Sequence, residues 1–298
     1  MYFLYLLFLS VTVVQSQRFT KDIIHFCDPN VTSSCGPDGK CMPRKTGNRC
    51  KCPSGFMGKA CKRPCQDIYK SCDQWKEESR CTWAHPISPF FEDNCAASCH
   101  QCVIGKTKLV TPLPPILEPL AWLIGRWETE TTAGLRYPAS MVGPYREVLE
   151  IVNSDVPMFD RPPLNITVRA ESVDGSDHHV EVGFITGKPF KEDTGFMRRI
   201  SGDKRIDKVA IEMVSNAGLI TIEEGYLKNR RIKLALKYER TIFPTDDPNY
   251  IKNSSRSFKL ISRNRLREHG KIVDRNGKVR QWSKQYRKTF DYLSPVFI

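Results

Sequence analysis

The sequence predicts a mainly β protein in which two small disulfide-rich modules precede a larger antiparallel β-barrel or sandwich. All 12 cysteines lie between Cys27 and Cys102, so the residues after Cys102 form a cysteine-free part. In that part, short alternating or β-branched runs recur between turn signals, and only residues 117–125 have helix-like spacing. This distribution predicts a domain boundary just after Cys102.

Residues 1–16 are predicted to be a secretory signal peptide. An apolar stretch runs from Tyr2 to Val14, and the small residue Ser16 suits cleavage before Gln17. The stretch is not preceded by Lys or Arg, and a buried N-terminal strand or helix is the alternative. No run of 18 or more apolar residues occurs, so we expect a secreted, extracellular protein without a transmembrane segment.

The even number of cysteines in a short window behind such a leader indicates a disulfide framework, because small secreted modules lack enough core to fold without covalent closure. A cytosolic zinc site is the alternative. Three Asn-x-Ser/Thr triplets agree with secretion and predict glycosylation at Asn30, Asn165 and Asn253.

The first six cysteines resemble those of an EGF-like domain, which we expect over residues 23–62. Their last stretch reads Cys50-Lys-Cys52-Pro-Ser-Gly-Phe-Met-Gly-Lys-Ala-Cys61. The spacing alone does not choose among the many pairings open to six cysteines. The resemblance implies the pairs Cys27–Cys41, Cys35–Cys50 and Cys52–Cys61. Only Asp22 offers a carboxylate ahead of Cys27, so no metal ion is expected.

The next six cysteines, which start with Cys65 and Asp67 and close with a C-x3-C-x2-C stretch, resemble the ShK-toxin-like (ShKT) domain, expected over residues 64–102. The resemblance implies the pairs Cys65–Cys102, Cys72–Cys95 and Cys81–Cys99. Channel-blocking members carry a Lys and an aromatic residue between the third and fourth cysteines. Residues 82–94 contain no Lys or Arg, so a channel-modulating toxin is the least favoured function.

Residues 103–116 are rich in proline and predict an extended linker to a barrel domain over residues 117–292. The strand-like runs of this domain are Asn165–Glu171, His178–Ile185, Lys208–Val214, Leu219–Glu224, Arg231–Tyr238, Ser255–Ile261 and Lys278–Phe290. Closing such strands into a barrel would remove their exposed edges.

Four segments together resemble the nitrobindin-like (THAP-type) heme-binding β-barrels. They are residues 120–127 (LAWLIGRW), 179–184 (HVEVGF), 214–225 (VSNAGLITIEEG) and 255–260 (SRSFKL). The resemblance implies an antiparallel barrel of about ten strands that opens to a ligand pocket. It also implies that Gly125 lets the chain turn and that Trp127 fills one end.

Heme-binding members of that family use a His on the last strand as axial ligand. The corresponding residues here, 281–288, contain no His, and the family ending places the axial position at Gln281 or Ser283. Neither is a usual heme ligand. His179 matches a family His on the opposite side of the pocket and is a candidate ligand, although a structural histidine is the alternative.

The motifs favour a non-catalytic binding protein. The chain lacks G-x-S-x-G, H-E-x-x-H and P-loop patterns, so we predict no catalytic residue. The preferred interpretation is a secreted interaction protein whose barrel has lost its axial heme His. The alternative is a secreted heme protein with activity like that of a peroxynitrite isomerase or with nitric-oxide binding.

The positive charge is concentrated at the C-terminal end. The formal net charge of the chain is +13, and residues 251–298 alone contain 13 Lys or Arg against 3 Asp or Glu. Such a concentration favours polyanionic partners, and outside cells these are sulfated glycans rather than nucleic acid. An extracellular protein and an apolar small molecule in the barrel are further candidate partners, and a solvated barrel face is the alternative.

Overall fold

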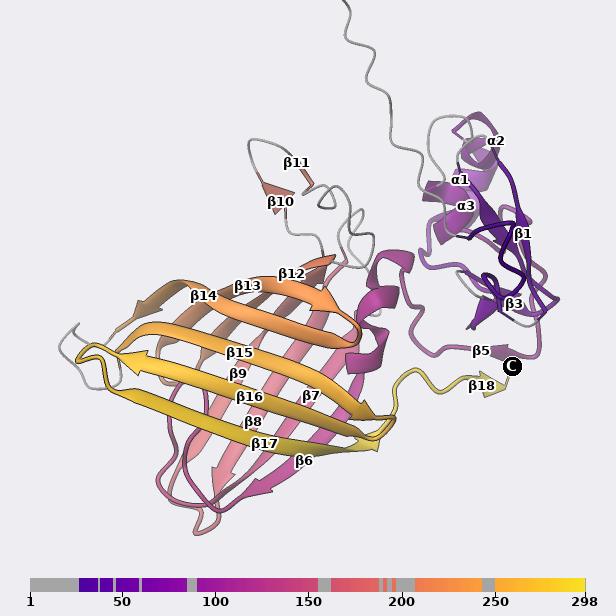
Figure 1. Ribbon diagram of the computed structural model, residues 1–298. Coiled ribbons are helices and arrows are strands. Elements are labelled where there is room, and N and C mark those ends of the chain that lie inside the picture. The colour runs from indigo at the N-terminus through magenta and orange to yellow at the C-terminus, as the bar shows by residue number, and fades with distance from the viewer. Residues whose placement is uncertain are drawn as a thin grey trace, which may run out of the picture.

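The computed structural model describes residues 27–36, 38–44, 47–58, 61–84, 90–154, 162–187, 190–191, 195–196, 207–242 and 250–297. The predicted signal peptide, residues 1–16, lies outside these ranges. The structure is mainly β and contains a closed antiparallel barrel together with an N-terminal disulfide-rich region (Figure 1). This confirms the predicted fold class. Within the described residues, no helix is long and apolar enough to cross a membrane.

The first disulfide-rich module consists of two short hairpins. Strand β1 (Lys40–Met42) pairs with β2 (Arg49–Lys51), and β3 (Phe56–Met57) pairs with β4 (Arg63–Pro64). Disulfides join Cys27 to Cys41, Cys35 to Cys50 and Cys52 to Cys61. These are the pairs that the EGF-like resemblance implied. With so few strand residues, the three covalent links supply most of the closure.

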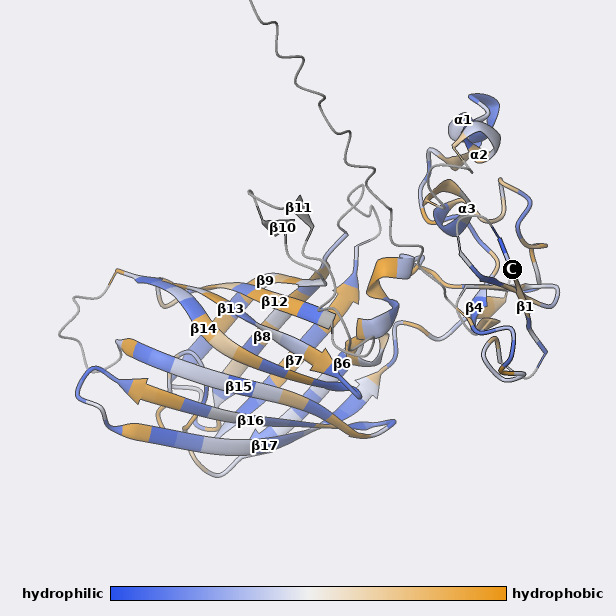
Figure 2. Ribbon diagram, turned by 45° about the horizontal axis from the view of Figure 1, so that its top comes forward, coloured by the Kyte–Doolittle hydropathy of each residue, from blue (hydrophilic) through white to orange (hydrophobic). Residues whose placement is uncertain are grey.

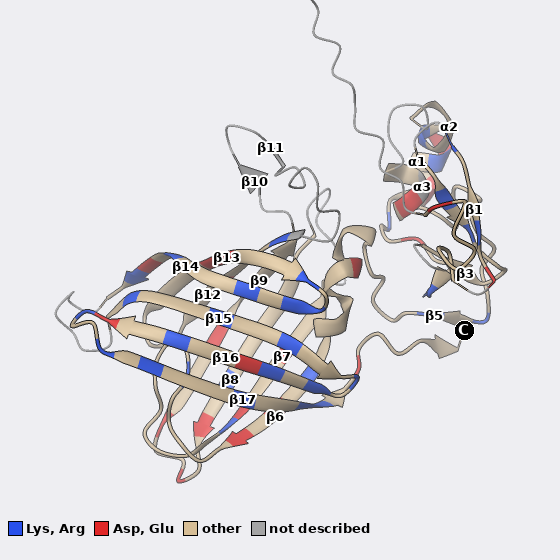
Figure 3. Ribbon diagram, viewed as in Figure 1, with Lys and Arg blue, Asp and Glu red and all other residues tan. Residues whose placement is uncertain are grey.

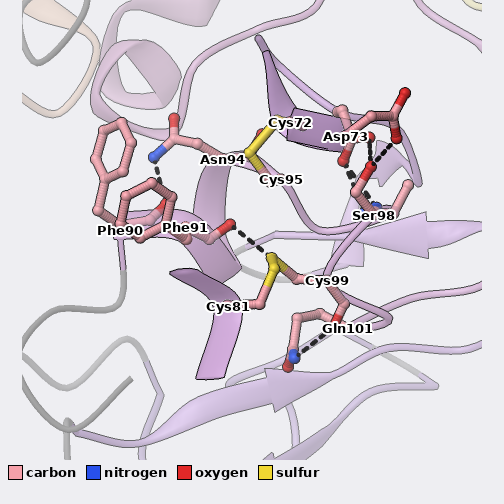
Figure 4. Close-up of a disulfide and its surroundings, with 12 residues drawn as sticks. Cys72, Asp73, Cys81, Phe90, Phe91, Asn94, Cys95, Ser98, Cys99 and Gln101 are labelled. Atoms are coloured by element: carbon pink, nitrogen blue, oxygen red, sulfur yellow. Dashed lines mark hydrogen bonds between the residues drawn. A yellow bond between two sulfur atoms is a disulfide. The ribbon is translucent and has the colours of Figure 1, made fainter. Parts of the chain in front are cut away.

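The second module contains three short helices, α1 (Cys72–Glu77), α2 (Arg80–Trp83) and α3 (Phe90–Asn94). Disulfides join Cys65 to Cys102, Cys72 to Cys95 and Cys81 to Cys99, again the implied pairs. Figure 4 draws the disulfides Cys72–Cys95 and Cys81–Cys99, and the backbone carbonyl oxygen of Phe91 lies 3.6 Å from the Cys99 sulfur.

The aspartate in the C-x-D start of this module closes it by hydrogen bonding. The Asp67 carboxylate accepts hydrogen bonds from the N–H groups of Ala97 and Ser98 and from the Ser98 hydroxyl, at 3.0, 3.1 and 2.6 Å. These hydrogen bonds to Asp67 therefore hold the start of the module to its final turn.

The segment between the modules and the barrel is held at both ends. Strand β5 (Thr107–Lys108) pairs with β18 (Val296–Phe297) near the C-terminus. The Gln66 side chain hydrogen-bonds the backbone N–H of Leu109 at 2.7 Å. Arg63 forms an ion pair with Glu118 at 2.5 Å. The side chains of Gln66 and Arg63 hydrogen-bond backbone groups of Leu109 and Leu113, so the predicted linker is ordered over these residues.

The helix-like spacing at residues 117–125 corresponds to η2, a 3-10 helix over Pro115–Leu123 that covers one end of the barrel (Figure 1). Its residues Leu117, Leu120 and Leu123 are buried. The Trp127 indole, which is fully buried, donates a hydrogen bond to the Leu123 carbonyl at 2.7 Å. The end of the barrel is therefore sealed by apolar packing.

Ten strands form the barrel, and each is antiparallel to its neighbours. They are β6 (Gly125–Thr131), β7 (Tyr145–Asn153), β8 (Leu164–Ser172), β9 (His178–Gly187), β12 (Asp207–Ser215), β13 (Leu219–Lys228), β14 (Arg231–Thr241), β15 (Ile251–Ser262), β16 (Arg265–Asp274) and β17 (Val279–Phe290). Strand β17 pairs with β6 and closes the barrel. A two-stranded hairpin, β10 (Phe190–Lys191) and β11 (Gly195–Phe196), lies between β9 and β12 in the chain.

Gly125 starts β6 at a place where a side chain would not fit. Its φ is +149°, and a Cβ there would come within 2.8 Å of the Phe290 carbonyl oxygen. Along the barrel strands polar and apolar residues alternate (Figure 2), so one set of side chains fills the interior and the other faces solvent.

Candidate functional site

The last barrel strand shows which residues face the interior. Along β17, Trp282, Lys284 and Tyr286 are buried, whereas Gln281 and Ser283 are exposed. The assignment of the axial position to Gln281 or Ser283 is therefore wrong, since neither side chain points into the barrel. Both residues are an odd number of positions from the inward Tyr286, and side chains at odd separations lie on opposite faces of a strand.

The barrel interior contains a layer of paired charges, which we call the buried charge network. Its central cation is Arg136, in the segment between β6 and β7, which is only 1% exposed. The guanidinium lies 3.0 Å from a carboxylate oxygen of Glu147 on β7 and 2.6 Å from one of Glu181 on β9. One arginine thus joins two strands that are not neighbours in the sheet.

Two more cations complete the buried charge network. The Lys284 ammonium lies 2.7 Å from Glu147 and 3.4 Å from Glu268. Arg256 on β15 makes a bidentate contact with Glu223 and lies 3.7 Å from Glu268. The network therefore contains three cations and four carboxylates, all in the barrel interior.

Tyr286 links the two halves of the network. Its hydroxyl hydrogen-bonds Glu147, and it lies 2.8 Å from a carboxylate oxygen of Glu268. Burial first, and then the charges of Glu147 and Glu268, raise the pKa of Tyr286 well above its usual value. The phenol therefore stays protonated, as a donor between two acids.

Glu147 and Glu223 of the network have pKa values shifted in opposite directions. Burial alone would raise the pKa of Glu147, but the charges of Lys284 and Arg136 outweigh it and lower that pKa to about 2. Burial raises the pKa of Glu223, and the charge of Arg256 offsets only part of that rise. Glu147 is thus held ionised, while Glu223 binds a proton more readily than an exposed glutamate does.

Among the described residues, the part of the interior beside the network leaves almost no free space. The cavity beside the network, which Tyr137, Arg256 and Tyr286 help to line, measures about 20 Å³. Beyond the network, Tyr137 packs with Ile251, Ile272 and Trp282 and fills the end of the barrel opposite η2. Sites for small organic ligands have volumes of roughly 300 Å³ or more.

The residues present in the barrel do not fit heme, the group that the family resemblance implies. The cavity is too small, and the inward side chains of β17 are Trp282, Lys284 and Tyr286 rather than His. A tyrosine can ligate heme iron, but the Tyr286 hydroxyl is held by Glu147 and Glu268.

His179 lies on the inward face of β9 but not in an open pocket. Its Nε2 atom is 3.2 Å from the Asp177 carboxylate. Glu181, two residues further on the same face, holds Arg136. His179 therefore borders a space that a buried side chain already occupies.

The outer face of strands β14 to β17 carries positive charges that are unpaired within the described ranges, in contrast to the paired charges of the buried charge network. Blue positions recur along these strands in Figure 3. We define the basic outer wall by its exposed cations: Arg231, Lys233, Lys259, Arg265, Arg267, Lys271 and Arg287. Among the residues that the structure describes, none of these seven forms an ion pair.

The strand register brings like charges of the basic outer wall together. Lys259 on β15 pairs with Arg231 on one side and with Arg267 on the other. Arg265 pairs with Arg287 in the same way. Like charges directly opposite each other on adjacent strands are destabilising. A contribution to the stability of the fold therefore does not explain this arrangement.

The sequence reasoning located the basic C-terminal strands but missed the buried charge network. Arg136 lies outside any strand-like run, and Glu147, Glu181 and Glu268 resemble solvent-facing residues in a one-dimensional pattern. A usable signal was present in β7, where Glu147 occupies a position otherwise taken by inward apolar residues.

Comparison with known families matches residues 116–288 to the model of the THAP4-like, heme-binding beta-barrel domain and residues 64–102 to the model of the ShK domain-like family. The ShKT resemblance and the barrel resemblance are thereby confirmed. Neither match covers residues 27–61.

Among curated proteins, the bovine protein named peroxynitrite isomerase THAP4 is 26% identical over 156 residues, which are 52% of this chain and 23% of that protein. The human protein of the same name is 26% identical over 154 residues. An uncharacterized Caenorhabditis elegans protein, C28H8.5, is 26% identical over 215 residues, or 68% of this chain and 65% of that one.

A solved structure, that of Rv2717c from M. tuberculosis, covers 60% of this chain and 99% of its own, with 17% identity and a TM-score of 0.42. The match to the THAP4 proteins spans only about a quarter of their length. The family model, in contrast, covers more than half of this chain and extends from before β6 to Lys288 in β17, the last strand of the closed barrel. The chain belongs to the family of THAP4-like, heme-binding β-barrel domains.

Proposed function

We propose that this protein is a secreted, non-catalytic binding protein whose basic outer wall binds sulfated glycans. The observation that carries the proposal is the register of Arg231, Lys259 and Arg267, which places three cations in a row without a carboxylate partner among the described residues. A row of cations on a rigid sheet suits a polymer with regularly spaced anions.

Neutral side chains between the cations support this function. Gln281, Ser283 and Gln285 lie on the exposed face of β17, and Gln285 pairs with Arg267. Their amide and hydroxyl groups can hydrogen-bond sulfate or sugar oxygens without adding negative charge. The two residues first assigned to the heme site thus lie on the same outer face as the basic outer wall.

Secretion is supported by the cysteine-rich region. Six disulfides within 76 residues are typical of oxidising compartments. We propose that residues 23–62 form an EGF-like domain, because Gly55 and Gly58 have φ values of +88° and +83° in the turn that precedes Cys61. Both glycines supply the backbone geometry that this motif needs.

The direct test is affinity for heparin as a sulfated probe. The triple variant R231Q/K259Q/R267Q should bind at least about ten-fold more weakly, since each exposed ion pair contributes up to about 1 kcal/mol. A matched variant, K40Q/K70Q/K76Q, loses the same charge from exposed residues of the disulfide modules and should bind like the wild type. Equal weakening of both variants would show that net charge, not the wall, governs binding.

The second candidate function is heme binding with peroxynitrite isomerase activity, favoured by the family match and by the name of the THAP4 relatives. We propose that this chain does not bind heme, because Arg136 and Tyr137 fill the interior. Titration of hemin into disulfide-intact protein should give no saturable Soret band. A band that saturates at one heme per chain and disappears in H179A would contradict the proposal and identify His179 as the ligand.

A further inference from the structure

A second exposed surface lies on the other side of the barrel. A groove of about 500 Å³ crosses the outer faces of β8, β9, β12 and β13. Its exposed apolar residues are Val182, Phe184, Val214 and Ile220, which are 50%, 49%, 49% and 40% exposed. Contiguous exposed apolar surface of this kind usually marks a place that another group covers.

The strand register arranges the groove in two rows, each of which begins at β8. In one row Asn165 pairs with Phe184, which pairs with Glu212, which pairs with Ile222. In the other row Thr167 pairs with Val182, which pairs with Val214, which pairs with Ile220.

The residues that begin the two rows are the outer members of a glycosylation triplet, Asn165-Ile166-Thr167. Ile166 is buried in the barrel, so Asn165 and Thr167 both face outward, and both line the groove. Asn165 is half-buried and directly opposite the exposed ring of Phe184. The acceptor amide is therefore beside the apolar surface that needs a cover.

We propose that Asn165 carries an N-linked glycan whose first sugar residues cover this groove and pack against Phe184. This inference rests on the proposed secretion, because the sugar donor is a lipid-linked diphosphate oligosaccharide of the secretory pathway. The Asn165 Nδ2 atom forms a bond to C1 of N-acetylglucosamine while the C1–O bond to the diphosphate breaks. The amide loses one proton, and the diphosphate lipid leaves with the electron pair.

A glycan suits the groove better than a second copy of the chain does. Glu212 lies in the middle of the first row and is exposed. A two-fold contact through this face would bury two carboxylates and two asparagine amides among apolar residues, at a large desolvation cost. A sugar has apolar C–H faces for Phe184 and Val182, and its hydroxyl groups can hydrogen-bond Glu212 and water.

The experiment expresses the whole chain in cells that secrete and glycosylate proteins, and maps the peptides around Asn30, Asn165 and Asn253 by mass spectrometry. Asn165 should be occupied. Occupancy at Asn30 or Asn253 without Asn165 would overturn this inference and leave secretion intact. Recovery of the chain in the medium with none of the three occupied would overturn this inference alone, and absence of the chain from the medium would overturn the proposed secretion.

Coverage of the groove is tested by removing the glycan in two ways. Both N165Q and T167A abolish the triplet, and each should raise the fluorescence of a bound hydrophobic dye by about two-fold or more and promote self-association. T167S retains the triplet, and N253Q removes an exposed asparagine on β15, so both should behave like the wild type. If N165Q and T167A bind no more dye than N253Q, the glycan does not cover the groove.

Discussion

Arg256 and Lys259 lie three residues apart on β15, one inside the barrel and one on its outer face, and their surroundings differ completely. Arg256 contacts Glu223 and Glu268 within the buried charge network. Lys259 is exposed between Arg231 and Arg267, with no anion beside it in the described structure. Lys284 and Arg287 on β17 repeat the contrast.

The difference teaches how to separate structural charges from functional ones in this barrel. A buried cation has lost its water and must be paired, so its partners are fixed by folding. An exposed cation needs no partner, and rows of unpaired cations cost stability rather than add to it. Charge that folding does not explain is therefore the better guide to a binding surface.

The largest expected effect comes from breaking the inner network. R136M leaves Glu147 and Glu181 without their shared cation and should lower the free energy of unfolding by about 3–5 kcal/mol. The matched control is R146M on β7, since Arg146 pairs with Glu130 at 3.1 Å but both side chains are more than 70% exposed. That change should cost less than about 1 kcal/mol in the same urea denaturation.

Equal losses in the two variants would contradict the distinction between buried and exposed pairs. A loss in R136M that is accompanied by a new capacity to bind hemin would instead show that Arg136 is what excludes the ligand. Circular dichroism in the near ultraviolet checks that both variants keep the native packing.

The next effect concerns pH. Because the folded pKa of Glu147 is about 2, below its usual 4.5, this residue stabilises the fold fully above pH 4.5 and loses its contribution as the pH falls toward 2. The wild type should lose about 3 kcal/mol from this group over that window. E147Q lacks the titrating group, so its free energy of unfolding should fall less steeply with acidification.

Two comparisons sharpen the pH measurement. Hydrogen bonds from Ser172 and Ser176 also lower the pKa of Asp174 to about 2, but this residue is exposed, so D174N should change the slope much less. Glu223 has a raised pKa, so its contribution is lost as the pH rises, and E223Q should remove a decline on the alkaline side of pH 4.5. An unchanged acid slope in E147Q would mean that the network is not held by an ionised Glu147.

The composition of the strands explains which parts of the fold could be predicted from the sequence. Strands β8, β9, β12, β13, β14, β15 and β17 were located by runs of alternating or β-branched residues. Strand β16 was missed because its pattern, RLREHGKIVD, is mostly charged or polar and has β-branched residues only at Ile272 and Val273. The number of strands came only from the family resemblance.

The candidate site could be predicted only in part, for a geometric reason. The concentration of positive charge in residues 251–298 is visible in composition, but which cations share the outer face depends on strand register. The wrong assignment of the axial heme position to Gln281 or Ser283 also came from register, because a displacement by one residue exchanges the inner and outer faces of a strand. Arg136 reaches the interior from a segment between strands, which no periodic pattern describes.

The smallest predicted effect tests whether the basic outer wall costs stability. Arg267 lies opposite Lys259, whereas Lys271, four residues along the same strand, lies between Ser255 and Gln281. R267Q should therefore raise the free energy of unfolding by roughly 0.2–1 kcal/mol at low salt, while K271Q should leave it unchanged. High salt should remove the gain because it screens exposed charges. If R267Q lowers the free energy of unfolding, Arg267 has a structural partner and the unpaired row of cations is not evidence of a binding surface. If R267Q raises the free energy of unfolding yet weakens heparin binding, the row is retained at a cost in stability that only a polyanionic ligand offsets.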